Sequence, residues 1–250
     1  MKKLNFLVLI FVLMINMPAM SFSSDDERID NYLSVLSVGS KKEKKTMLNR
    51  LQWSGLSDPR LFNEIESHVK AWESNIDSDW SNHDGVLPFY IRALGFSGNE
   101  KYRATIVKLY DNPHAANVRK YSKRALRDLG RFGNWNEQIK QSNVVVEGKP
   151  AEVATYMKML SVDDVLVQRL AARAMYHEHQ RDSDLLSLAA NRLKSLYLQP
   201  GLSADAQDTA AWLCKALGQN KASEYRTLLT TVAEATPHEK IRKYAKKYAF

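Results

Sequence analysis

The stretch Val118-Arg119-Lys120-Tyr121 returns as Ile241-Arg242-Lys243-Tyr244, 123 residues further along the chain. At the same offset, Ala93-Leu94-Gly95 matches Ala216-Leu217-Gly218. An offset that holds across separate stretches indicates duplicated structural units. One third of it is 41 residues, which is a typical length for a unit built from two helices.

Each unit carries an apolar stripe with helical spacing. From Val118 onward, apolar and small residues recur every three or four positions, so they lie on one side of a helix. Similar stripes begin at 167, 206 and 241, and second helices are predicted between them and upstream. Glycines at four breaks are expected to end helices in the left-handed conformation. The predicted second helices are 58–73, 99–111, 183–197 and 221–234, with a further helix at 151–160, and the glycines are Gly55, Gly95, Gly130 and Gly218.

Two segments resemble HEAT repeats, most closely the shorter units of bacterial proteins and phycobilin lyases. They are Leu56-Ser57-Asp58-Pro59-Arg60-Leu61 and the run from Asn112 to Arg119. The resemblance covers most of residues 40–250. It implies an all-α superhelix, a solenoid of about five helix pairs plus a terminal helix, whose Val-Arg helices line a concave wall. Residues 133–150 lengthen one spacing and are predicted to be an insertion.

Several residues are expected to serve the repeat structure itself. Val118, Leu126, Cys214 and Ile241 fall on the buried stripes. Cys214 is the only cysteine and could act as a nucleophile, but its place on a stripe favours a small buried residue with an unreactive thiol. In the resembled repeats an arginine bonds a neighbouring repeat, and that resemblance gives Arg119 and Arg242 a structural role.

The N-terminal segment is typical of a secretory signal peptide. Lys2 and Lys3 precede an apolar run from Leu4 to Ile15, and small residues follow it. Ala19 and Ser21, or Ser21 and Ser23, fit the positions before a cleavage site. We expect residues 1–23 to be removed and 24–250 to form one periplasmic or secreted domain, without membrane insertion. An uncleaved anchor is the alternative.

The formal charge of +8 favours an acidic partner, and export makes nucleic acid a poor candidate. The segment from Arg119 to Arg131 places its cations opposite the apolar stripe, and the last helix repeats part of this pattern. The alternative is a solvated face, since the helices at 163–175 and 205–218 are nearly neutral. The residues predicted to bind a partner are Lys120, Lys123, Arg124, Arg127 and Lys246.

The remaining groups of polar and aromatic residues do not match a catalytic or metal-binding motif. His177-Glu178-His179 has the wrong spacing for two zinc ligands on one helix face, so a solvated helix end is favoured. No catalytic motif is found, and neither a metal nor another cofactor is expected. Trp53, Trp72 and Trp80 fit equally an exposed binding patch or a buried first repeat.

The sequence therefore predicts a non-enzymatic scaffold of the bacterial cell envelope that binds another protein with an acidic surface. We expect the protein to be a monomer. Two alternatives remain: an enzyme or enzyme subunit related to the lyases, and a binder of an anionic envelope polymer.

Overall fold

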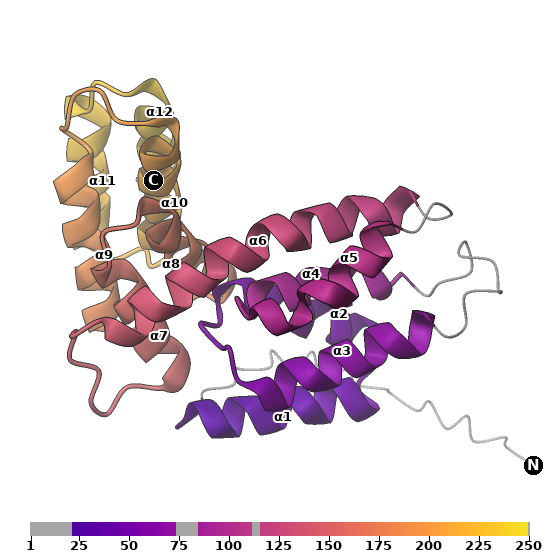
Figure 1. Ribbon diagram of the computed structural model, residues 1–250. Coiled ribbons are helices and arrows are strands. Elements are labelled where there is room, and N and C mark those ends of the chain that lie inside the picture. Colours follow the sequence, from indigo (N-terminus) through magenta and orange to yellow (C-terminus); the bar gives the residue numbers. More distant parts are fainter. Residues whose placement is uncertain (1–21, 74–84, 112–115, 250) are drawn as a thin grey trace, which may run out of the picture.

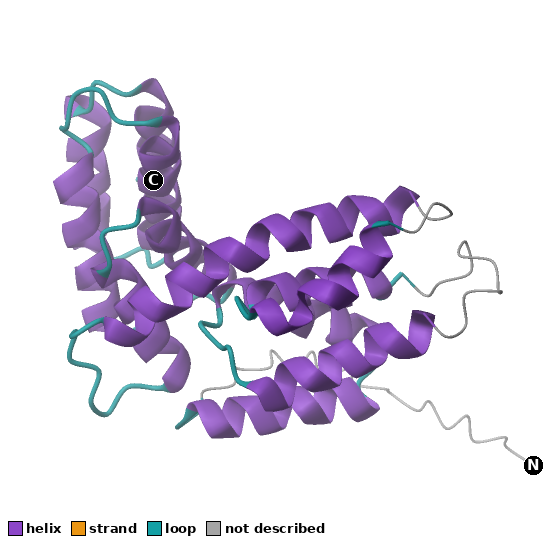
Figure 2. Ribbon diagram, in the orientation of Figure 1, coloured by secondary structure: helices purple, strands orange, loops and turns teal. Residues whose placement is uncertain are grey.

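The computed structural model describes residues 22–73, 85–111 and 116–249, and all regular structure in these ranges is helical, as predicted (Figure 2). The predicted leader and Trp80 lie largely or wholly outside them. The α-helices are α1 (Asp25–Val38), α2 (Lys41–Arg50), α3 (Pro59–Glu73), α4 (Leu87–Phe96), α5 (Arg103–Tyr110), α6 (Ala116–Gln141), α7 (Ala151–Ser161), α8 (Val165–His177), α9 (Ser183–Leu196), α10 (Ala204–Gly218), α11 (Ser223–Ala235) and α12 (Glu239–Tyr248), with 3-10 helices η1 (Leu51–Trp53) and η3 (Glu100–Tyr102).

Capping side chains set where several of these helices begin. Ser40 and Glu43 form a reciprocal capping box at α2, which is otherwise dominated by lysine. Asp164, Asp182 and Ser203 each accept hydrogen bonds from the first turn of α8, α9 and α10. The capping box explains an ordered α2. With α1 before it, the described residues form six helix pairs, where about five pairs and a terminal helix were predicted.

The helices pair in chain order, α1 with α2 through to α11 with α12, and the pairs stack into two layers. Within the even-numbered layer, α2 packs on α4, α4 on α6, α8 on α10 and α10 on α12. The layer is interrupted between α6 and α8, where α6 contacts α7 and η1 contacts α8. Figure 1 accordingly shows two arms that run in different directions, α1–α6 and α8–α12.

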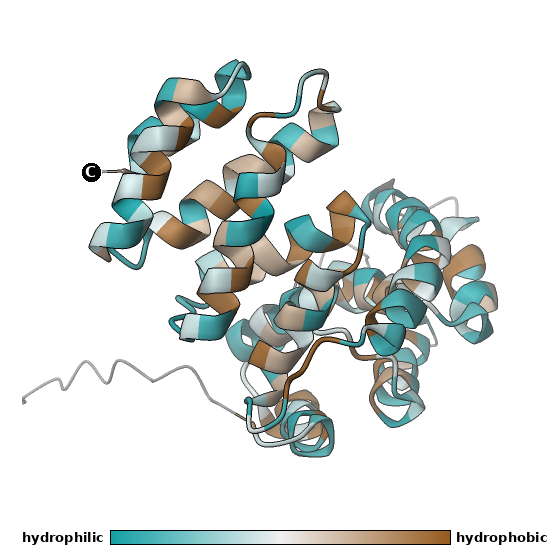
Figure 3. Ribbon diagram, turned by 90° about the vertical axis from the view of Figure 1, so that its left-hand side faces the viewer, coloured by the Kyte–Doolittle hydropathy of each residue, from teal (hydrophilic) through white to brown (hydrophobic). Residues whose placement is uncertain are grey.

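One continuous core fills the space between the layers, because each helix has a hydrophobic side and a hydrophilic side (Figure 3). Of the expected structural residues, Val118, Cys214 and Ile241 are buried and Leu126 is half-buried. None of the described helices has both the length and the apolarity of a membrane span.

Glycine has two different roles here, and only one was anticipated. Gly55 has a φ of +67°, as expected at a helix break. Gly95 is the next-to-last residue of α4, and Gly218 is the last residue of α10. A Cβ at Gly95 would come within 2.6 Å of the Ala125 carbonyl oxygen, and one at Gly218 within 2.5 Å of the Tyr248 Cβ. These two glycines let α6 cross close to α4, and α12 close to α10. The helices end at these glycines, as predicted, but neither glycine adopts the left-handed conformation that was expected there.

The prediction around Gly130 also needs correction, because α6 continues through it to Gln141. The helix is held there by the turn after α4. Asn136 Nδ2 donates to the Ser97 carbonyl at 3.1 Å, and the Gly98 backbone lies directly against Gly133. The non-helical connection therefore spans 142–150, and not the whole of 133–150.

Candidate functional site

Four helices of the even-numbered layer carry a cation immediately before a buried alanine. The cations are Arg92 on α4, Arg124 on α6, Arg173 on α8 and Lys215 on α10. Because successive helical residues are about 100° apart, a residue before a buried position lies on the flank of the helix. The corresponding alanines are Ala93, Ala125, Ala174 and Ala216.

On the second arm, these cations lie over tryptophan and tyrosine rings. The Arg173 Cζ is 5.8 Å from the Trp53 ring centroid and 5.5 Å from that of Trp212. The Lys215 Nζ is 3.5 Å from the Trp212 centroid and 4.7 Å from that of Tyr244. Trp212 thus contacts two cations from adjacent helices.

Further rings connect these pairs. Trp53 and His177 stack with centroids 5.8 Å apart and planes 11° apart. Tyr176 meets Trp212 edge-on at 5.7 Å, and its hydroxyl lies 3.3 Å from that of Tyr248. The ring contacts therefore run without a break from buried Trp53 in η1 across α8 and α10 to α12.

The first arm contributes two cations of the same kind. The Arg92 Cζ lies 5.1 Å from the Phe96 centroid, and the Arg124 Cζ lies 5.8 Å from that of Tyr121. We call the assembled surface the cation–aromatic face. Its members are Arg92, Arg124, Arg173 and Lys215 with Trp53, Tyr121, Tyr176, His177, Trp212 and Tyr244.

These cations lack carboxylate partners. Within the described residues, Arg92, Arg124, Arg173 and Lys215 form no ion pair and no hydrogen bond through their side chains. The Nε atoms of Arg92 and Arg173 are buried and without an acceptor. Burial lowers the pKa of both guanidinium groups, and neighbouring cations lower each further. The charges of Asp128 near Arg92 and of Asp208 near Arg173 act in the opposite direction and only partly offset this. The face is therefore a concentration of positive charge that an anion would relieve.

The position of Trp53 in the face is fixed by the buried carboxylate of Glu178. Glu178, whose side chain is 9% exposed, accepts from the Trp53 Nε1 at 3.0 Å and from the Tyr156 hydroxyl at 2.6 Å. The Arg50 Nε lies 3.7 Å from the same carboxylate. Glu178 follows α8, Trp53 is in η1 and Tyr156 is on α7, so this group ties the two arms together beside Arg173.

The residues predicted to bind a partner are placed unequally by the structure. Arg124 belongs to the cation–aromatic face, and Arg127 pairs with Asp128 at 3.1 Å. Lys120, Lys123 and Lys246 are exposed and lie outside the face. Arg242 donates to the Thr236 carbonyl at 2.6 Å, in the turn before its own helix, and Arg119 is exposed on α6.

Sequence reasoning missed Arg92, Arg173 and Lys215, although a signal for two of them exists. An aromatic residue stands three positions before the cation in Phe89/Arg92, Tyr121/Arg124 and Trp212/Lys215. In the structure Arg124 and Lys215 lie over these rings, whereas Arg92 lies over Phe96. Residues three apart are neighbours on a helix surface. The 123-residue offset relates the first of these pairs to the third. Arg173 has no such partner on its own helix and takes its rings from η1 and α10.

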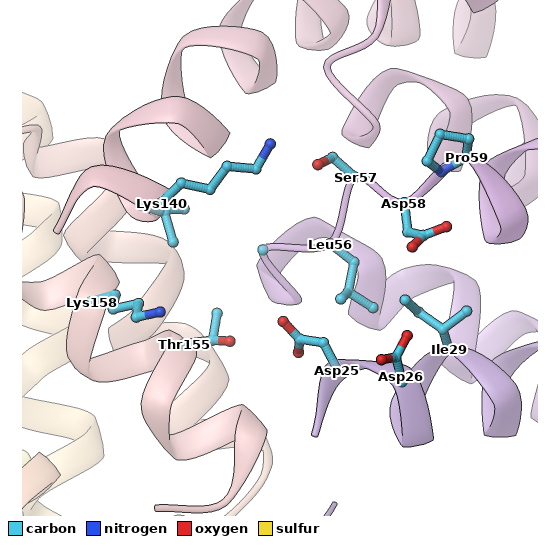
Figure 4. Close-up of a pocket in the computed structure, with 12 residues that line it drawn as sticks. Asp25, Asp26, Ile29, Leu56, Ser57, Asp58, Pro59, Lys140, Thr155 and Lys158 are labelled. Atoms are coloured by element: carbon cyan, nitrogen blue, oxygen red, sulfur yellow. The ribbon is translucent and has the colours of Figure 1, made fainter. Parts of the chain in front are cut away.

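Elsewhere, an open pocket of about 470 Å³ lies between α1, the segment before α3, α6 and α7 (Figure 4). Asp25, Asp26 and Asp58 line it opposite Lys140 and Lys158. Its carboxylates are already engaged. Asp25 pairs with Arg28 at 2.8 Å, and Asp26 and Asp58 pair with Arg60 at 2.5 and 2.9 Å. We therefore place the candidate site on the cation–aromatic face.

The side chains of His177, Glu178 and His179 point to different surroundings and do not form one site. His177 stacks on Trp53, Glu178 turns toward Tyr156, and His179 is exposed with a φ of +53°. Burial lowers the pKa of His177, and the charges of Arg173 and Lys215 lower it further. Among the described residues, no group of three His, Cys, Asp or Glu side chains has the arrangement of a metal site.

No family model and no curated protein matches the chain. A search of solved structures finds human deoxyhypusine hydroxylase in complex with glycerol, with 12% sequence identity and a TM-score of 0.36. That match covers 88% of this chain and 82% of the other.

Proposed function

We propose that this protein is an exported, HEAT-like scaffold of the bacterial cell envelope, without enzymatic activity of its own. In this proposal the cation–aromatic face holds an acidic segment of a partner protein. The supporting observation is a set of four cations that lie on aromatic rings and have no carboxylate partner among the described residues.

Both components of the face suit a peptide. Guanidinium groups bind carboxylates through paired hydrogen bonds, and arginine, tryptophan and tyrosine are the residues most enriched in binding hot spots. Half-buried Trp212 and Tyr176 add apolar contact area, which a purely anionic polymer would not use. An acidic segment with interspersed apolar side chains would contact both.

The test is crosslinking in living cells with a photoreactive amino acid. We would place it at Tyr176 on the face and, as a control, at exposed Lys123. The proposal expects a discrete protein adduct from Tyr176 only, and its loss when Arg92 and Arg173 are both replaced by glutamine. Equal adducts at the two positions, or an adduct that survives the double substitution, would contradict the proposal.

The two alternatives give different results. A binder of anionic polymer predicts that the material trapped at Tyr176 is polysaccharide or lipid, and that heparin competes with it. The enzyme alternative predicts an absorbance band or bound metal in the purified protein. A protein adduct that is insensitive to heparin would favour the scaffold over both.

A further inference from the structure

The two cleavage positions that the sequence leaves open differ in whether they keep Phe22. Ala19 and Ser21 fit cleavage after Ser21, whereas Ser21 and Ser23 fit cleavage after Ser23. In the structure Phe22 belongs to the folded domain. Its side chain is 8% exposed, and its carbonyl oxygen accepts a hydrogen bond from the Ala151 N–H at 2.8 Å.

That hydrogen bond satisfies the start of α7. The first N–H groups of a helix have no partner within the helix, and a capping side chain usually supplies one. The residue before α7 is Pro150, which makes no side-chain cap. Removal of Phe22 would leave the N–H of buried Ala151 without its acceptor, which destabilises the folded chain.

The Phe22 nitrogen also faces a buried acid. It lies 3.4 Å from Glu152 Oε2, while the other oxygen, Oε1, lies 3.4 Å from the Nε of buried Arg28. Burial raises the pKa of Glu152. Within a continuous chain this nitrogen is an amide with one N–H. As a chain terminus it would be an amine with a pKa of about 7.7–8.0, cationic at neutral pH and with three donors.

We propose that the chain is cut between Ser21 and Phe22, and that the new α-ammonium group of Phe22 pairs with the carboxylate of Glu152. The cut is a hydrolysis by an export-associated peptidase that selects small residues. Water adds across the Ser21–Phe22 amide, Ser21 leaves as a carboxylate, and the Phe22 amine takes up a proton. The inference rests on the export part of the proposed function, and it replaces cleavage after Ser23.

The first test is the N-terminal sequence and intact mass of the protein recovered from the envelope of expressing cells. A chain that begins at Phe22 is expected. A chain that begins at Ser24, or one that keeps the leader, would overturn the cleavage assignment. Neither result depends on partner binding, so failure here and failure of the cation–aromatic face are separate outcomes.

The second test isolates the ion pair in chains that begin at Phe22, released from a cleavable fusion. Acetylation of the α-amine should lower the midpoint of thermal unfolding by about 2–4 °C. It should have little effect in Glu152→Gln, and its full effect in the control Glu27→Gln, whose exposed carboxylate accepts from Ser23. An acetylated chain as stable as the free amine would exclude the pair.

Discussion

At the scale of single residues, Gly95 and Gly218 show why part of the repeated sequence is repeated. Both stand at the same place in the 123-residue duplication, and both meet the neighbouring helix at a residue related by the same offset, Ala125 and Tyr248. The duplication therefore preserves a helix crossing. A side chain at either glycine would separate two helices of the even-numbered layer.

Gly95→Ala should destabilise the protein by about 1–3 kcal/mol, because its Cβ would lie 2.6 Å from the Ala125 carbonyl oxygen and 2.8 Å from its Cα. Gly130→Ala is the matched control within a helix. A Cβ there meets nothing within 4 Å, so alanine should raise stability by up to about 1 kcal/mol. Urea denaturation of both variants measures the difference. Equal effects of the two substitutions would refute the crossing argument.

Cys214 should resist thiol reagents in the folded protein. Its side chain is fully buried, and burial raises the pKa of the thiol to about 12. At about pH 8 the reactive thiolate is therefore scarce as well as inaccessible. We expect labelling by a disulfide reagent only after unfolding in denaturant. Rapid labelling of the native protein would mean that α10 opens locally or that Cys214 is reactive.

At the scale of the elements, the helices were predictable where the apolar periodicity is clear. The predicted segments 58–73, 183–197 and 221–234 correspond closely to α3, α9 and α11. The prediction failed at α6, where Gly130 was taken as a break. Contacts from Ser97 and Gly98 on the preceding turn stabilise this part of the helix, and such long-range packing leaves no local pattern.

The contact between α3 and α4 should make stability depend on pH. His68 on α3 stacks on Tyr90 of α4 with centroids 4.9 Å apart, and burial lowers the pKa of His68 in the folded state. The unfolded chain, whose histidines titrate near about 6.5, then binds more protons, so stability falls as the pH drops through that value.

His68→Gln should reduce this loss of stability on acidification. Urea midpoints compared above and below the histidine range would measure the change. The same substitution at the exposed residue His179 is the control. A His68 variant with the original pH dependence would contradict the assignment.

At the scale of the whole molecule, the candidate site was only partly readable from the sequence. Positive charge on α6 was evident, and it led to Arg124. The charges on α8 and α10 were missed because the predicted segments 163–175 and 205–218 are nearly neutral when their acidic residues are counted, although Arg173 and Lys215 lie on the same layer. Trp53 joins Arg173 and His177 from more than a hundred positions away, through the junction of the arms.

That junction makes Glu178 the residue on which the relative position of the two arms should depend most. Glu178→Ala would leave the Trp53 N–H and the Tyr156 hydroxyl without their acceptor, at about 1–3 kcal/mol for each buried group. Since stacked repeats are stabilised mainly through neighbours, we expect the two arms to unfold in separate steps in this variant. Calorimetry and hydrogen exchange would resolve these steps.

The control is Glu137→Ala, which removes only an exposed pair with Lys140 and should leave a single transition. If Glu178→Ala also unfolds in one transition with unchanged stability, the arms are held together elsewhere, and the cation–aromatic face does not depend on this carboxylate.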